Sequence, residues 1–249
     1  MKIKLISLLL TALLLLSCTA CSAKDSDYIK GKGTVVVGVT DYMPMNYLDS
    51  KGNWVGFDTE FAKFVFHNLG LEVKFETVFW DEKADDLNSK KIDCIWNGYT
   101  VNDIDDVEFT KPYAKNSQVF VTTFENKDLY TDVSKITDIN VAVEKGSASE
   151  RVIKTLGLKV EPVYCDTQKD ALIALSDGRA EGCVVDKMIY NSLVHTDLAC
   201  CVILNVEEFA IGFRKGSDMV EIVNDEIDKL IDSGELDALA DKYEIELIK

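Results

Sequence analysis

Apolar positions along this chain follow two alternating patterns, one typical of β-strands and the other of amphipathic helices. β-branched or alternating runs predict strands at 34–39, 71–79, 92–96, 118–124, 139–143, 160–164, 182–185, 202–206 and 209–213. Apolar residues three and four apart predict helices from Asp58 to Gly70, after a capping box at 147–150, over 167–176, and twice from Met219 onward. Strands that alternate with helices indicate mostly parallel sheets covered on both faces, and two such sets predict two lobes.

The first residues do not share this pattern. Lys2 and Lys4 precede an apolar run from Leu5 to Leu16. This run is too short to span a bilayer, because a spanning helix needs about 20 residues. A basic start followed by a short apolar run is typical of a secretory signal peptide, which we place at residues 1–17. We therefore expect an exported protein.

The end of this segment resembles a bacterial lipoprotein signal, in which a cysteine that follows a small residue is lipidated and becomes the new N-terminus. Leu15-Leu16-Ser17-Cys18 fits that pattern, and Cys21 is the alternative lipidation site. Ordinary cleavage with both cysteines free is a further alternative. A diacylated Cys18 would attach the protein to the outer side of the cell membrane by its lipid anchor only, with residues 18–32 as a flexible tether.

Composition narrows the classes of partner. Apolar residues make up 47% of the chain and charged residues 28%, as in globular proteins. The 43 acidic and 27 basic residues give a formal charge of −16, which argues against nucleic acid as a partner. With two histidines and no Cys/His cluster, we expect no metal and no cofactor. Cys94 and Cys183 lie in apolar strand patterns and are expected to be buried, while a disulfide stays possible in an exported chain.

Eight short motifs follow one another along residues 33–245. They are Gly38-Val39 with Tyr42-Met-Pro44, Val55-Gly-Phe-Asp58, Lys91-Ile-Asp93 with Gly98-Tyr-Thr100, Phe109-Thr-Lys-Pro-Tyr113, Lys145-Gly-Ser147, Gly178-Arg179, Val184-Val-Asp186 and Ile211-Gly-Phe-Arg-Lys-Gly216. In this order they resemble the family 3 extracellular solute-binding proteins, the polar amino-acid receptors of ABC importers.

That resemblance implies an α/β, two-lobe periplasmic-binding-protein-like fold of type II, with two mixed, mostly parallel sheets, flanking helices and a hinge. Lobe 1 is expected at 33–122 and 209–249, and lobe 2 at 123–208. The strands near 118–124 and 209–213 would form the hinge. The resemblance also implies a monomeric binding protein and not an enzyme. Such a protein captures a small polar solute, an amino acid in the leading interpretation, and delivers it to an ABC transporter permease.

The resemblance also implies a ligand site in the cleft between the lobes. Asp41 and Asp186 are expected to pair with the ligand's ammonium group, although a helix N-cap is the alternative role of Asp186. Tyr42 and Trp80 match the family's aromatic walls, with core packing as their alternative role. Tyr99 borders the cleft strand.

Four further residues are expected to contact the ligand, three of them at its carboxylate. Gly98 allows close approach of the backbone, and Thr100 supplies a hydroxyl and an N–H group. Ser147 and Ala148 begin a helix, whose N-terminus favours an anion. Ser147 is equally suited to capping that helix.

One family feature is missing. An arginine usually follows the Gly-x-Thr turn and grips the carboxylate, but residues 101–108 contain neither lysine nor arginine, and the expected place falls on Ile104 or Asp105. Either the carboxylate rests on Thr100 and the helix start at Ser147, or the ligand is an amine or other cation. Two other classes also stay open, a dehydratase-like cleft enzyme that uses Asp41 or Asp186, and a sensory solute-binding protein for a cationic ligand.

Overall fold

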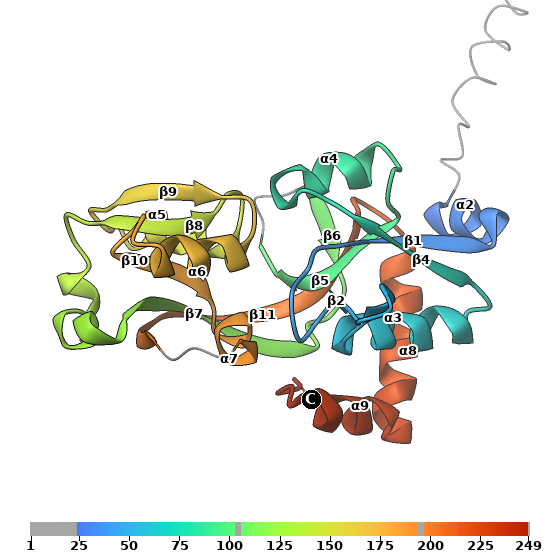
Figure 1. The fold of residues 1–249 in the computed structure, drawn as a ribbon. Helices are drawn as coiled ribbons and strands as arrows, with labels where there is room; N and C mark the ends of the chain where they lie inside the picture. Colours follow the sequence, from blue (N-terminus) through green and yellow to red (C-terminus); the bar gives the residue numbers. More distant parts are fainter. Residues whose placement is uncertain (1–23, 103–105, 194–196, 249) are drawn as a thin grey trace, which may run out of the picture.

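The computed structural model describes residues 24–102, 106–193 and 197–248 (Figure 1). The predicted signal peptide, Cys18 and Cys21 lie outside these residues. The helices are α2 (Asp25–Lys32), α3 (Phe57–Asn68), α4 (Lys83–Asn88), α5 (Ala148–Thr155), α6 (Gln168–Ser176), α7 (Lys187–Ser192), α8 (Met219–Ser233) and α9 (Glu235–Tyr243), with 3₁₀ turns η2 (Trp80–Glu82), η3 (Phe124–Leu129) and η4 (Val133–Lys135). The strands are β1 (Thr34–Val39), β2 (Tyr47–Leu48), β3 (Trp54–Val55), β4 (Glu72–Thr77), β5 (Cys94–Thr100), β6 (Val107–Phe109), β7 (Ala114–Thr123), β8 (Asn140–Glu144), β9 (Glu161–Cys165), β10 (Gly182–Asp186) and β11 (Leu198–Arg214).

The main sheet has the strand order β4-β1-β5-β11-β7-β10-β8-β9, and β6 also pairs with β11. β1 is parallel to β4 and β5, and β8 is parallel to β9 and β10. The long antiparallel strands β7 and β11 run between these two parallel sets, which lie at opposite ends of the molecule (Figure 1). The predicted two-lobe α/β fold is confirmed. The strands of both lobes form one continuous sheet, where two sheets were expected, because β7 and β11 connect the two parallel sets.

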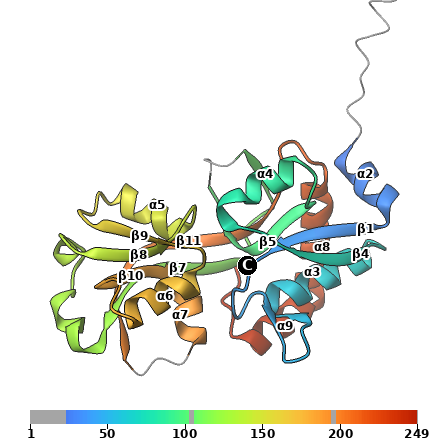
Figure 2. The same cartoon turned by 45° about the horizontal axis from the view of Figure 1, so that its top comes forward.

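Helices cover both faces of each parallel set. Figure 2 shows α4 and α3 on opposite faces of the set that contains β1, and α5 and α6 on opposite faces of the set that contains β8. The strands of both sets are rich in buried valine, as expected for parallel strands covered on two sides.

β11 corrects the prediction of two separate strands at 202–206 and 209–213. It runs unbroken for 17 residues from Leu198 to Arg214. The intervening Glu207 and Glu208 are charged and interrupt the apolar pattern, but their backbones pair with Asn116 and Lys115 of β7. Residues 198–209 of β11 pair with β7, and residues 209–214 pair with β5 and β6, with register shifts along the strand.

Helix α2 corrects part of the predicted flexible tether. Residues 25–32 of that tether form a helix whose Ile29 is completely buried. Asp25 makes an ion pair with Arg214 at 2.8 Å, and the Ser26 hydroxyl donates to Asp218 at 2.6 Å. These polar contacts with the distant C-terminal part of the chain hold the helix together with the packing of Ile29 and Tyr28 on the core.

Asp58, the predicted first residue of the helix, lies inside α3 and does not cap it. The helix begins at Phe57, and its cap residue is Gly56. Asp58 is completely buried and accepts hydrogen bonds from the Gly98 backbone N–H and the Tyr113 hydroxyl, both at 2.7 Å. Burial raises the pKa of Asp58 to about 7. This carboxyl therefore ties α3 to the strand that leads into the cleft.

Cys94 and Cys183 are completely buried, as predicted. The five described cysteines, which are residues 94, 165, 183, 200 and 201, are all free thiols. None of the helices within the described ranges is long and apolar enough to cross a bilayer.

Candidate ligand-binding cleft

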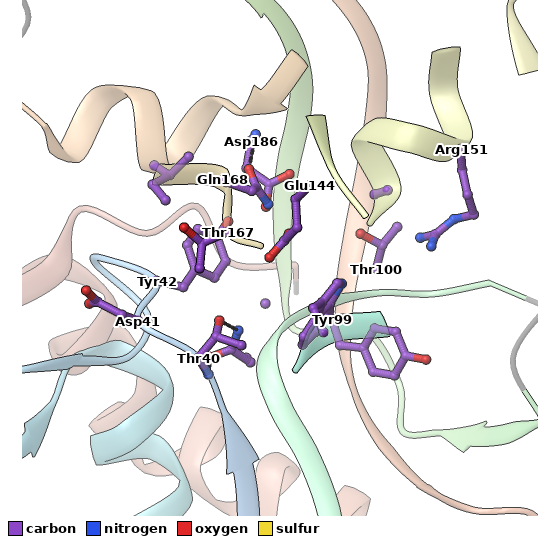
Figure 3. Close-up of a pocket in the computed structure, with 15 residues that line it drawn as sticks. Thr40, Asp41, Tyr42, Tyr99, Thr100, Glu144, Arg151, Thr167, Gln168 and Asp186 are labelled. Atoms are coloured by element: carbon purple, nitrogen blue, oxygen red, sulfur yellow. Dashed lines mark hydrogen bonds between the residues drawn. The ribbon is translucent and has the colours of Figure 1, made fainter. Parts of the chain in front are cut away.

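A cleft of about 440 Å³, including its solvent-open part, lies where the carboxyl ends of the parallel strands of the two sets face each other. Ligands of open α/β sheets commonly bind at this edge. The first set contributes the segment after β1, the end of β5 and η2, while the second contributes the ends of β8 and β10 and the starts of α5, α6 and α7 (Figure 3). The lining residues are Thr40, Asp41, Tyr42, Trp80, Asn97, Gly98, Tyr99, Thr100, Glu144, Ala148, Arg151, Thr167, Gln168, Asp186 and Ile189.

The structure brings eight of the nine predicted site residues to this cleft. They are Asp41, Tyr42, Trp80, Gly98, Tyr99, Thr100, Ala148 and Asp186. Ser147 is the exception. Its hydroxyl donates to the Glu144 carbonyl at 2.7 Å and accepts from the Glu150 backbone N–H at 3.2 Å, so Ser147 acts as the N-cap of α5.

Asp186 ends β10 and is 4% exposed. Its carboxylate accepts hydrogen bonds from the side-chain amides of Gln118 and, at 3.0 Å, Gln168. Burial raises the pKa of Asp186, and these two amides act in the opposite direction. Asp186 precedes α7 without a capping hydrogen bond from its side chain, so its partners are amides and not a helix N-terminus.

Gly98 makes room for aromatic side chains. Its φ is +54°, and a Cβ atom there would lie 2.5 Å from Tyr42 Cε1 and 3.0 Å from Phe209 Cε2. Tyr42 packs edge-on against Phe209 and is 4% exposed. Burial, followed by the negative charge of Asp186, raises the pKa of Tyr42. The absence of a side chain at Gly98 therefore leaves the space that the Tyr42 ring occupies.

The other two predicted aromatic residues form a second wall. Trp80 packs edge-on against Tyr99, with ring centroids 5.4 Å apart, and Tyr99 packs in turn on Phe109. Tyr99 is 1% exposed, so its ring supports the half-buried Trp80 from the core side.

The Thr100 hydroxyl already has a carboxylate as its hydrogen-bond partner. Its hydroxyl donates to Glu207 at 3.0 Å, and Glu207 also accepts from Asn116 at 2.6 Å and Gln118 at 2.7 Å. Burial and the neighbouring Asp186 raise the pKa of Glu207 to about 7. A ligand carboxylate at the Thr100 hydroxyl would therefore face a buried acid. The positions expected for the family arginine, Ile104 and Asp105, lie outside the described residues.

Glu144 is a cleft residue that the sequence reasoning missed. It ends β8 just as Asp186 ends β10, it is 5% exposed, and its side chain points into the cleft between Tyr42 and Thr100 (Figure 3). Burial raises the pKa of Glu144 to about 8, the charge of Asp186 adds to that rise, and Lys83 opposes it. Its sequence signal was an acid at the end of an apolar strand.

Arg151 is the second residue that was missed. It lies in the first turn of α5, and its guanidinium extends toward Thr100 (Figure 3). Among the described residues it makes no ion pair. This role has no signal in the sequence, because the capping-box pattern involves Ser147 and Glu150 and not Arg151. Thr40, Asn97, Thr167 and Gln168 complete the polar lining without having been predicted.

The rim of the cleft is crossed by contacts between the two sets. Asp41 is mostly exposed there and lies 3.8 Å from Lys169 Nζ. The Ser192 hydroxyl donates to the Met43 carbonyl at 3.0 Å. Within the described ranges, no group of three or more His, Cys, Asp or Glu side chains is placed to hold a metal ion.

Comparison with known proteins agrees with this geometry. The model of the bacterial extracellular solute-binding proteins, family 3, matches residues 35–246. The L-cystine-binding protein TcyJ of Escherichia coli K12 is 26% identical over 223 residues, which cover 86% of this chain and 84% of TcyJ. The arginine-binding extracellular protein ArtP of Bacillus subtilis is 27% identical over 256 residues, which cover 96% and 97%. A substrate-binding protein of an ABC uptake transporter from Streptococcus pneumoniae, solved with bound histidine, has a TM-score of 0.82 and 26% identity over 89% of this chain and 96% of that one. The chain therefore belongs to the family 3 bacterial extracellular solute-binding proteins.

Proposed function

We propose that this protein captures an amino acid in the cleft and delivers it to an ABC transporter permease. Family membership supports this function, and so do the names of the relatives, which bind cystine or arginine or were solved with histidine. The observation that carries the proposal is the buried carboxylate of Asp186, which lines the cleft with amide partners and, among the described residues, no cationic one. Such a group is suited to the ammonium of an amino acid.

The missing family arginine is replaced, in this proposal, by Arg151. Arg151 is the one arginine that lines the cleft within the described residues, and it lies near the positive end of the α5 dipole. The hydroxyl groups of Thr100 and Ser147 are already used by Glu207 and by backbone groups. A guanidinium is therefore the better partner for the ligand's carboxylate. Tyr42 and Trp80 then enclose the ligand's side chain, and Asp41 lies at the rim.

We further propose that lobe 1 (33–122 and 209–249) and lobe 2 (123–208) move about β7 and β11, closing on the ligand. The two long strands are the main connection between the parallel sets, and the rim contacts are between side chains and loops.

The proposal includes a lipid anchor at Cys18, with Cys21 as the alternative, and a monomeric protein without enzymatic activity. A dehydratase needs a positioned acid or base at the reacting atoms, whereas Asp186 is held by two amide side chains in a way suited to static binding. Incubation with prephenate or arogenate tests that alternative, and turnover of either would contradict the binding function. A sensory role for a cationic solute would instead leave uptake unchanged when the gene is deleted.

A thermal-unfolding screen tests the main proposal. Amino acids, their decarboxylated amines and small peptides are added to the purified protein. A ligand at about 100 times its Kd should add about 2.7 kcal/mol to the free energy of unfolding. Stabilisation by at least one amino acid is expected. A protein that is stabilised by amines alone, or by none of these solutes, would contradict the proposal.

A further inference from the structure

We propose that Glu144 is a specificity-determining residue, which binds a positive charge on the ligand's side chain and thereby selects cationic amino acids. This inference rests on the proposed amino-acid-binding function and narrows it to one class of ligand.

Glu144 is buried in the wall of the cleft. The residue stands at the carboxyl end of β8 with 5% exposure, and its side chain points into the cleft (Figure 3). No lysine or arginine among the described residues forms an ion pair with it. A carboxylate in such a place loses hydration without gaining a fixed counter-charge. Its burial thus leaves a cation-binding position on the cleft wall.

The interior of the cleft has more acidic than basic side chains. The charged residues that line it away from the rim are Glu144, Asp186 and Arg151. A zwitterionic amino acid matches Asp186 with its ammonium and Arg151 with its carboxylate. Glu144 then has the side-chain amide of Gln168 as a hydrogen-bond partner but no counter-charge, and it lies near a second buried acid. A ligand with a further positive charge neutralises all three residues.

The lysines near Glu144 already have other partners. Lys83 Nζ donates to the carbonyls of Trp80 at 3.0 Å and Gly146 at 3.4 Å. Lys145 pairs with Asp81 at 2.7 Å. The charge of Lys83 reaches Glu144, but burial and Asp186 outweigh it, because the pKa of Glu144 is raised to about 8. Near neutral pH, Glu144 therefore keeps its proton in the empty cleft, and a ligand cation would take the place of that proton.

The test compares L-arginine with L-citrulline, which has a neutral group of nearly the same shape in place of the guanidinium. Calorimetric titrations use the wild-type protein, Glu144→Gln, and the control Glu161→Gln. Glu161 is an exposed acid of the same lobe, at the start of β9. Wild type and control should bind arginine at least about 30-fold more tightly than citrulline, which corresponds to losing a buried charge pair. Glu144→Gln should abolish most of this preference.

Two results would overturn the inference. One is wild-type protein that binds citrulline or L-glutamine as tightly as arginine, and this comparison holds even if Glu144→Gln does not fold. The other is a folded Glu144→Gln variant that keeps the full preference for arginine. Tight binding of a neutral amino acid would remove the inference and keep the proposed function, whereas no binding of any amino acid would remove both.

Discussion

Lys145 Nζ lies 2.7 Å from Asp81 Oδ2, and this ion pair joins the loop after β8 to η2 across the cleft. The neighbouring Gly146 has φ +71°, and a Cβ atom there would lie 2.9 Å from Asp81 Cα. Lys83 Nζ reaches the Gly146 carbonyl from the same side. The backbones of the two lobes thus come close together at Gly146.

We predict that Gly146→Ala weakens ligand binding by hindering lobe closure. The added methyl group would press on the backbone of Asp81 only when the lobes are together. Gly157→Ala is the matched control, because Gly157 also has a positive φ of +62° but no atom within 4 Å of its Cβ position. Both substitutions should lower the free energy of unfolding by about 1 kcal/mol through backbone strain.

The measurement is the radius of gyration by small-angle scattering, with and without a saturating ligand found in the thermal screen. The wild-type protein and Gly157→Ala should become more compact with ligand, and Gly146→Ala should do so less. Equal compaction and equal affinity in the two alanine variants would argue against closure at Gly146.

We predict that Arg151→Ala reduces the affinity for L-arginine much more than the affinity for agmatine, its decarboxylated amine. The expected loss for L-arginine is about 1.5–3 kcal/mol, the range for hydrogen bonds to charged groups. Arg179→Ala is the control, because Arg179 is exposed and pairs with Asp177 away from the cleft. Equal losses for arginine and agmatine in calorimetry would mean that Arg151 does not hold the carboxylate.

We predict that the ligand-free protein becomes less stable as the pH rises from about 5 to 8. Burial and Asp186 raise the pKa of Glu144 to about 8, against the opposing effects of Lys83 and Gln168, while Asp170 adds a smaller rise. Between the unfolded pKa of 4.5 and the folded value, the folded state holds a proton that the unfolded state has released. The free energy of unfolding therefore falls with pH across this window.

Thermal unfolding at several pH values checks this prediction, with Glu144→Gln showing a shallower decline than Glu161→Gln. Buried Asp58 and Glu207, each with a pKa of about 7, should leave a residual decline in the same direction. A melting temperature that rises from pH 5 to 8 would be inconsistent with the buried acids described here.

We predict that Cys18→Ser abolishes lipid labelling in cells and that Cys21→Ser does not. The basis is the apolar run that ends at Ser17, immediately before Cys18. Metabolic labelling with a fatty-acid analogue, followed by fractionation, measures the anchor. Loss of labelling in the Cys21 variant alone would move the lipidation site to Cys21.

The sequence predicts the strands well where burial is uniform. β1 occupies the predicted residues 34–39, because a run of β-branched residues that is largely buried favours the extended conformation of a strand. Helix α2 could not be anticipated in the same way, since it depends on contacts of Asp25 and Ser26 with residues about 190 positions away. Long-range pairing also explains β11, whose polar residues are held by β7.

In the cleft, too, residues with a local sequence pattern could be predicted, and residues placed by long-range packing could not. Asp186 was expected from the family resemblance, whose motif places an acid after a valine strand, and Glu144 has the same position at the end of β8. Arg151 could not be found, because only the direction of α5 relative to Thr100 brings its side chain to the cleft (Figure 3). The role of Ser147 was ambiguous in the sequence, and its hydrogen bonds place it in the helix cap.

The most direct test of the account is calorimetric titration of wild-type and Asp186→Asn protein with L-cystine and the proteinogenic amino acids. Asp186 is the buried carboxylate assigned to the ligand's ammonium group. The account predicts that the wild type binds at least one amino acid, and that Asp186→Asn, while still folded, binds it at least about 30-fold more weakly. Wild-type protein that binds no amino acid, or a folded Asp186→Asn variant with unchanged affinity, would contradict it.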